Sequence, residues 1–121
     1  MPWDFRDDIP IYAQLITQLQ RQIVSGQLRP GERLLPVREL AAEAGVNPNT
    51  MQRALMEMER QELVFSQRTA GRFVTEDLER IQDLKTTLAR ARVRGFLEDM
   101  AGLGFRGRDL LALMEQEGES T

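Results

Sequence analysis

Hydrophobic residues recur every three or four positions over much of the chain, which is the period of an amphipathic α-helix. The first such run lies at 10–25, where Pro10 suits the first turn and Gly26 suits the position after the last one. Its apolar stripe consists of Ile11, Leu15, Leu19 and Ile23. We therefore predict a first helix over 10–25, followed by a turn at 28–31 and a short strand at 32–34.

Two shorter helices follow, separated by a glycine. The first spans 36–44, and Gly45 supplies the left-handed conformation that a tight turn requires. Asn47 is a good N-cap and Pro48 suits the first position of the next helix, which should end near Gln61. The inward stripe of this third helix consists of Met51, Ala54, Leu55 and Met58. Two helices joined in this way predict a helix-turn-helix, a motif whose second helix enters the major groove of DNA.

Bulky residues in two short segments mark the end of the helix-turn-helix. The segments 63–66 and 72–75 are strand-like, with Phe and Val as their bulky members. The loop between them, 67–71, is polar and contains a glycine. A β-hairpin directly after a helix-turn-helix predicts a winged helix for residues 1–75.

The remaining residues, 76–121, contain a long segment with an apolar position at every third or fourth residue. This seam has the spacing of a coiled coil and consists of Ile81, Leu84, Leu88, Ala91 and Gly95. Leu97 and Met100 extend its apolar face. Gly102 and Gly104 interrupt it, a last helix is predicted over 108–116, and 117–121 should fray. The seam could instead belong to a core helix, but a two-helix appendage has little else to bury it against, which favours a partner subunit.

The predicted fold class is therefore mainly α. It combines an N-terminal winged helix-turn-helix, with a small hairpin as its wing, and a C-terminal two-helix dimerisation arm. The two parts meet between residues 75 and 76.

Composition removes several classes of function. The 121 residues include no Cys and no His, which excludes disulfides and Ser-His or Cys-His catalysis and leaves only carboxylates to bind zinc. We therefore expect no enzyme activity, no metal site and no cofactor. No apolar run approaches the ~20 residues of a membrane helix. Met1-Pro2-Trp3-Asp4 lacks the character of a signal peptide, so we expect a cytoplasmic protein that binds no membrane.

The net charge of −3 is unevenly distributed. Residues 1–75 hold nine Arg and nine Asp or Glu, whereas 76–121 hold seven Lys or Arg and ten Asp or Glu. Local clusters of arginine in the first part can bind phosphate, and the acidic part should lie away from DNA. We interpret Arg90, Arg92 and Arg94, which lie in the acidic part, as a solvated face rather than a second nucleic-acid patch.

Polar residues on the outward face of the third helix are the candidate DNA readers: Asn49, Thr50, Gln52 and Arg53. Asn and Gln pair with adenine edges, Thr contacts the thymine methyl group, and Arg suits guanine or phosphate. The competing interpretation is a solvated helix face. Arg38 lies near the start of the second helix, which crosses the DNA backbone in this motif, so it suits a backbone contact. The competing interpretation is an ion pair with a nearby Glu. Arg68 and Arg72 flank the hairpin loop, where they suit a contact with the minor groove or the DNA backbone. The competing interpretation is a simple solvated turn.

Taken together, these motifs resemble the GntR family of bacterial transcription regulators. The matching segments are Ile9-Pro10-Ile11-Tyr12, Gly31-Glu32-Arg33-Leu34, Val37-Arg38-Glu39-Leu40-Ala41, Val46-Asn47-Pro48-Asn49-Thr50 and Gly71-Arg72-Phe73-Val74. The tail is similar to the YtrA-like subfamily in Phe96-Leu97-Glu98-Asp99-Met100 and Leu103-Gly104-Phe105. The resemblance implies a homodimer that binds double-stranded DNA at a palindromic operator, usually as a repressor, and leaves an unknown small-molecule effector open.

The resemblance also implies site residues and shows one departure. Five residues lie where the family contacts DNA, with Asn47 and Arg53 as additions: Arg38, Asn49, Thr50, Gln52 and Gly71. The family usually reads Leu-Pro-Ser-Val-Arg where this chain has Leu34-Leu35-Pro36-Val37-Arg38, so the capping Ser is missing. Losing such a cap costs ~1 kcal/mol, which Pro36 partly offsets.

We therefore predict a sequence-specific DNA-binding transcriptional regulator. The alternative function is a winged-helix protein-interaction module without DNA affinity. An apolar outward face on the third helix would have favoured that alternative.

Overall fold

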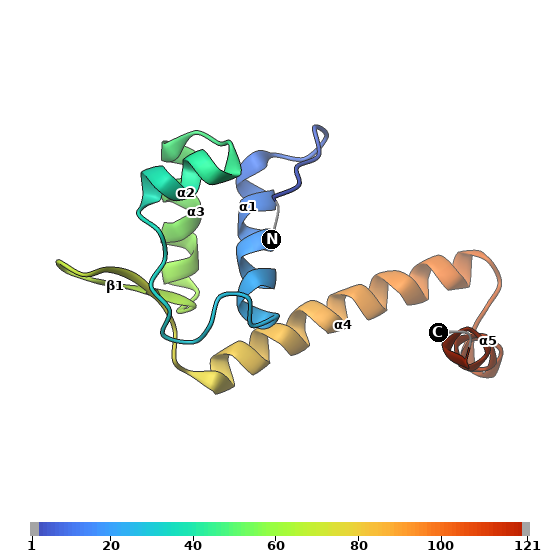
Figure 1. The fold of residues 1–121 in the computed structure, drawn as a ribbon. Helices are drawn as coiled ribbons and strands as arrows, with labels where there is room; N and C mark the ends of the chain where they lie inside the picture. The colour runs from blue at the N-terminus through green and yellow to red at the C-terminus, as the bar shows by residue number, and fades with distance from the viewer. Residues whose placement is uncertain (1–2, 120–121) are drawn as a thin grey trace. The chain divides into compact units, whose positions relative to one another are not determined.

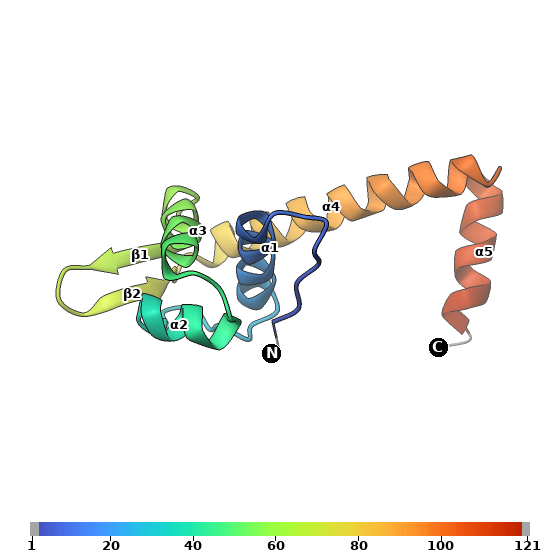
Figure 2. The same cartoon turned by 90° about the horizontal axis from the view of Figure 1, so that it is seen from above.

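The structure, a computed structural model, describes residues 3–119 (Figures 1 and 2). It divides into two compact units, one ending at Lys85 and the other beginning at Thr86. The elements are α1 (Ile11–Val24), α2 (Val37–Ala44), α3 (Pro48–Arg60), β1 (Val64–Gln67), β2 (Gly71–Val74), α4 (Leu78–Gly102) and α5 (Gly107–Glu119). The mainly helical fold with a winged helix-turn-helix and a small hairpin is confirmed.

The core of the first unit lies where α1 and α2 pack against α3. The side chains that are almost completely buried come from α1, α3 and the hairpin: Leu15, Leu19, Ile23, Met51, Leu55, Met58, Leu63 and Val74. Each such burial stabilises the fold by roughly 1.5–3 kcal/mol. The predicted inward stripe of α3 is confirmed, because all four of its members are buried. In α1, by contrast, the first stripe residue, Ile11, is exposed.

The turn between α2 and α3 follows from its residues. Gly45 takes the left-handed conformation at the end of α2, with a φ of 71°. The Asn47 side chain then caps α3, since its Oδ1 accepts a hydrogen bond from the Asn49 backbone N–H at 2.7 Å. At the start of α2, Pro36 is the capping residue and makes no side-chain hydrogen bond, as expected from the missing Ser.

The wing is an antiparallel hairpin in which Val64 pairs with Val74 and Gln67 with Gly71. The predicted strand at 32–34 was wrong as a strand. It forms one isolated bridge, Arg33 with Phe73, flanked by backbone hydrogen bonds to β2. The segment cannot continue along the hairpin because the chain enters α2 at Val37. It nevertheless fixes the inner edge of the wing.

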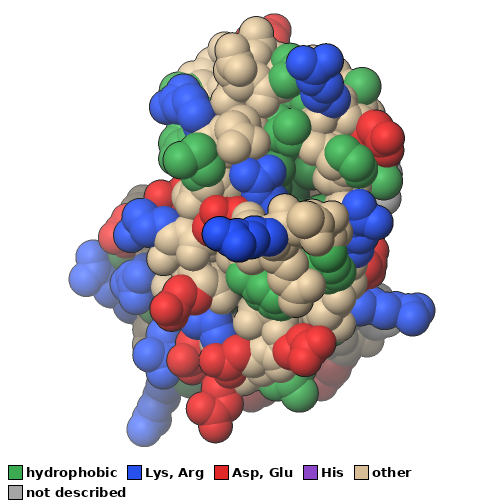
Figure 3. Space-filling model, turned by 90° about the vertical axis from the view of Figure 1, so that its left-hand side faces the viewer, with side chains coloured by type: hydrophobic (Ala, Val, Ile, Leu, Met, Phe, Trp, Pro, Cys, Tyr) green, Lys and Arg blue, Asp and Glu red, His purple; other side chains and the backbone are tan. Residues whose placement is uncertain are grey.

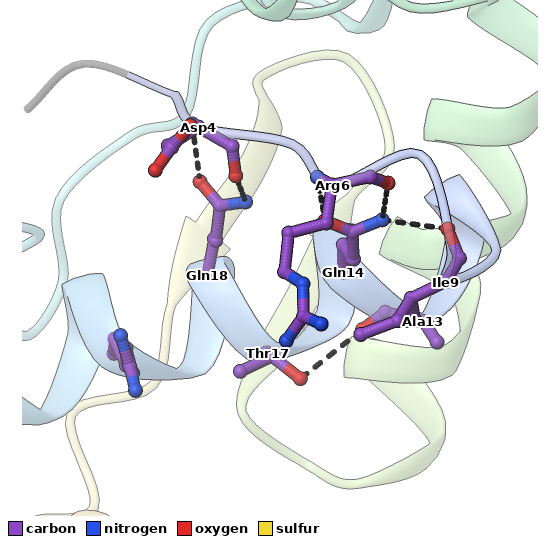
Figure 4. Close-up of a pocket in the computed structure, with 8 residues that line it drawn as sticks. Asp4, Arg6, Ile9, Ala13, Gln14, Thr17 and Gln18 are labelled. Carbon is purple, nitrogen blue, oxygen red and sulfur yellow. Dashed lines mark hydrogen bonds between the residues drawn. The ribbon is translucent and has the colours of Figure 1, made fainter.

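An N-terminal segment, residues 3–9, lies along α1 (Figure 4). The buried Gln14 side chain accepts a hydrogen bond from the Arg6 backbone N–H and donates to the carbonyls of Arg6 and Ile9. Gln18 makes the same kind of pair with the backbone of Asp4. A hollow of about 410 Å³ remains between this segment and α1. Two glutamines thus hold a segment that lacks regular structure.

The second unit contains the rest of α4 together with α5, whose Leu110 is buried. The last helix is longer than predicted: 117–119 are helical rather than frayed, because Glu115, Glu117 and Glu119 are good helix formers. Residues 120 and 121 of the predicted tail lie outside the described residues. In the described part of the chain, no helix combines the length and the apolar character that spanning a membrane requires.

The first unit extends ten residues beyond the predicted boundary at 75/76. Two contacts explain this. Leu84 is buried, and the Arg80 Nε–H donates a hydrogen bond to the Gln61 carbonyl at 3.0 Å. The start of α4 therefore belongs with the winged helix.

Candidate nucleic-acid interface

The first two turns of α3 present a polar surface. Asn49 and Arg53 are exposed, and Thr50 and Gln52 are half-buried, while the opposite stripe is buried. The first turn contains no acidic residue, so nothing offsets the partial positive charge of the helix N-terminus. Backbone N–H groups in such a position attract phosphate. The predicted reader residues therefore lie together on one surface that suits an anionic partner.

Arg53 has a partner within the protein. Its guanidinium carbon lies 4.6 Å from the centre of the Tyr12 ring, which belongs to α1. Such a cation–π contact contributes about 0.5–1 kcal/mol at an exposed site. The contact restricts where this arginine can reach, and sequence reasoning did not foresee it.

The last turn of α3 is neutralised by its own ion pair. Arg60 donates to Glu57, and Gln61 adds a second hydrogen bond to the same carboxylate. The hydrogen bonds from Arg60 and Gln61 lower the pKa of Glu57 from 4.5 to about 2. The charge that remains available to a ligand therefore lies nearer the beginning of α3.

Arg38 is exposed in the first turn of α2. The ion pairs found among residues 3–119 do not include it, so the alternative partner, a nearby Glu, is not observed. Its charge is therefore available to a ligand, and its contact with a DNA phosphate stays a prediction.

The wing brings two arginines near its glycine. Gly71 has a φ of +105°, and a Cβ at this position would lie 3.1 Å from the Arg33 Nε. Arg33 and Arg68 line one hollow together with Gly71, Arg72 and the start of α2. Sequence reasoning missed Arg33, because only the bridge to Phe73 brings it to the hairpin. Figure 3 shows Lys and Arg side chains around the projecting hairpin, with most Asp and Glu side chains of that view below it.

Arg72 differs from the other candidates because a carboxylate already binds it. Its Nε lies 2.8 Å from the Glu59 Oε1, and the Ser66 hydroxyl donates to the same oxygen. Partial burial alone would raise the pKa of Glu59, but the hydrogen bonds from Ser66 and Arg72 and the charge of Arg72 together lower it. Glu59 is therefore ionised at neutral pH and joins α3 to both strands.

The predicted dimerisation residues are distributed over both units. Leu84 is buried and Ile81 half-buried in the first unit. In the second unit Leu88 and Met100 are half-buried, whereas Ala91, Gly95 and Leu97 are exposed. Six further large apolar side chains are exposed in that unit: Val93, Phe96, Leu103, Phe105, Leu111 and Met114. A search along a single stripe missed them because they lie on other faces of α4, in the turn and on α5.

Comparison with known proteins gives this surface a context. Residues 11–74, which include α1 to β2, match the family described as "Bacterial regulatory proteins, gntR family". The chain belongs to the GntR family. This GntR protein is 39% identical to the HTH-type transcriptional regulator YhcF of Bacillus subtilis over 107 residues. The aligned residues cover 88% of each chain. It is 34% identical to the HTH-type transcriptional repressor YtrA of the same organism, over 83% of this chain and 72% of that one.

Solved structures support the same assignment for the GntR fold. A GntR family transcriptional regulator from Listeria monocytogenes matches with a TM-score of 0.87 and 37% identity, over 93% of this chain and 98% of that chain. The DNA-binding domain of AraR, crystallised with operator ORX1, matches 55% of this chain and 81% of its own with 28% identity and a TM-score of 0.52. The protein is a DNA-binding transcriptional regulator of the helix-turn-helix type, and its relatives are regulators rather than enzymes.

Proposed function

We propose that this GntR protein is a repressor that binds a palindromic operator as a homodimer. The observation that carries the proposal is the polar surface at the start of α3, where Asn49, Thr50 and Gln52 lie together without an acidic neighbour in the first turn. The similarity to YtrA, which is named as a repressor, supports the direction of regulation.

The proposed DNA contacts follow from side-chain chemistry and position. Asn49 and Gln52 suit the edges of adenine, and Thr50 suits a thymine methyl group. Backbone phosphates are assigned to three residues at the edges of this surface: Arg38, Asn47 and Arg53. Arg68 and Gly71 of the wing are assigned to the minor groove or the adjacent backbone.

The proposed homodimer rests on the apolar side chains of the second unit. Phe96, Leu97 and Leu111 are all at least 40% exposed in a single chain. Covering them with a second copy would bury apolar surface at about 25 cal/mol per Å². Two subunits would then place two recognition helices at half-sites ~34 Å apart, or a multiple of that distance.

A protein-interaction module without DNA affinity is the alternative. It would need an apolar outward face on α3, and Met56 is the large apolar residue exposed there. The polar residues around it favour DNA.

Selection from a pool of random duplexes with the full-length protein tests the proposal. We expect an enriched inverted repeat, and an affinity for it that falls linearly on a plot of log affinity against log salt concentration. Enrichment of no sequence, or binding that does not respond to salt, would contradict sequence-specific binding through phosphates. Increased transcription from the selected site in a reporter strain would contradict repression.

A further inference from the structure

Glu59 connects the recognition helix to the wing. It lies near the end of α3, and one of its carboxylate oxygens accepts hydrogen bonds from Ser66 in β1 and Arg72 in β2. Ser66 and Arg72 are paired with each other in the hairpin register, so one oxygen holds one rung of the wing. The ion pair is partly shielded from water, with 20% of the Arg72 side chain and 30% of the Glu59 side chain exposed.

The same rung is held from its other edge. The Arg72 carbonyl accepts a hydrogen bond from the Leu34 backbone N–H at 2.8 Å, and the bridge between Arg33 and Phe73 lies beside it. Arg72 therefore binds α3 through its side chain and binds the segment before α2 through its backbone carbonyl. The wing residues Arg68 and Gly71 lie beyond this rung, toward the tip.

We infer that Glu59 is a positioning residue for DNA binding. By holding Arg72 and Ser66, it sets the angle of the wing relative to the recognition helix, so that Arg68 and Gly71 reach DNA while the reader residues occupy the major groove. In this role Arg72 holds the wing in position through Glu59 and contacts no phosphate. The inference rests on the proposed function, because it assigns a role within the same DNA interface.

The sign of one substitution separates this role from a plain electrostatic one. A carboxylate on a DNA-binding helix repels phosphate, so its removal should strengthen binding if charge alone matters. If Glu59 positions the wing, Glu59→Ala should weaken binding to the selected duplex at least as much as Arg68→Ala does. Glu57→Ala is the matched control, because it removes a carboxylate from the same helix without contacting the wing, and it should bind as tightly as wild type or tighter.

The salt dependence of binding gives a second measurement. Arg68→Ala should reduce the slope of log affinity against log salt by about one. Arg72→Ala should reduce it by the same amount, since the tip loses its position, and the double variant should show no further reduction. A double variant that loses about two would show that Arg72 contacts a phosphate itself and would overturn the inference.

A charge exchange between residues 59 and 72 separates loss of their ion pair from loss of the fold. Glu59→Arg combined with Arg72→Glu restores an opposite-charge pair, and it should recover affinity and salt slope relative to either single variant, with thermal unfolding measured for all. Failure of the folded double variant to recover binding would overturn the inference. If the wild-type protein binds no duplex at low salt, the proposed function fails instead; tighter binding by Glu59→Ala rejects only the role of Glu59.

Discussion

Arginine side chains in this protein divide into two groups according to whether a partner holds their charge. Arg60 and Arg72 have carboxylate partners on α3, and Arg53 lies over an aromatic ring. Arg38 and Arg68 are exposed and belong to no ion pair found in the part of the chain that the structure describes. A charge that a carboxylate already compensates adds little attraction for phosphate. The ring beside Arg53 is uncharged and leaves its charge uncompensated. In the proposed interface Arg38, Arg53 and Arg68 therefore carry the electrostatic part of DNA binding.

Two substitutions distinguish a contact with the DNA backbone phosphate from a contact that recognises a base pair. Arg38→Ala should weaken binding to all duplexes alike and reduce the salt slope by about 0.9, because one phosphate contact is lost. Gln52→Ala should leave the slope unchanged, cost about 1–3 kcal/mol at one base pair and relax the preference there. Equilibrium binding to the selected duplex and to its single-base variants measures both effects.

Arg60→Ala is the control for these two variants, since Glu57 already compensates its charge. Normal binding by both Arg38→Ala and Gln52→Ala would show that the recognition surface has been placed wrongly.

Sequence reasoning could predict which residues lie on the surface of α3, because helical period and burial follow from local pattern. It could not predict their partners. Tyr12 meets Arg53, and Glu59 meets Arg72, only after α1 and the hairpin have packed against α3. For the same reason Arg33 did not appear among the candidates.

At the level of elements, local signals decided most boundaries. Gly45 and the Asn47–Pro48 pair fixed the turn of the helix-turn-helix to within one residue of the prediction. The hairpin strands were displaced by one residue, because Gln67 and Gly71 pair with each other despite their turn-like character. The segment at 32–34 failed as a strand, since a single bridge does not form a ladder.

The cap of α3 carries a measurable part of the stability. Asn47→Ala removes the acceptor of the Asn49 backbone N–H and should lower the free energy of unfolding by about 1 kcal/mol. Denaturant unfolding followed by circular dichroism measures the change. Asn49→Ala, which removes an exposed amide side chain without a capping role, should change the stability much less; equal losses in the two variants would contradict the importance of the cap.

At the level of the whole molecule, the chain separates a neutral winged helix from a more acidic helical part. The first unit has a contiguous core, whereas the second buries Leu110 and exposes most of its other large apolar side chains. A monomer would leave those side chains in water, and the proposed pairing of two copies would remove them from it. The seam in the sequence therefore includes only part of the apolar residues that this unit exposes, and the dimer itself stays a prediction.

A charge in the seam tests the proposed dimer. Leu88→Asp should convert the dimer into monomers, because an unpaired carboxylate is costly to bury in an apolar interface. Thr87→Asp places the same charge on an exposed neighbour and should leave the dimer intact. Sedimentation equilibrium measures both masses; an unchanged mass for Leu88→Asp would refute the seam, and a monomeric wild type would refute the dimer.

The only tryptophan of the sequence, Trp3, lies at one end of the segment that precedes α1. Its ring stacks on Phe5 with 6.2 Å between the ring centres, and its indole N–H donates to Glu43 on α2 at 3.4 Å. Intrinsic fluorescence excited at the indole band therefore arises from a single fluorophore next to the helix-turn-helix. The unlabelled protein therefore carries its own optical reporter for the DNA-binding unit.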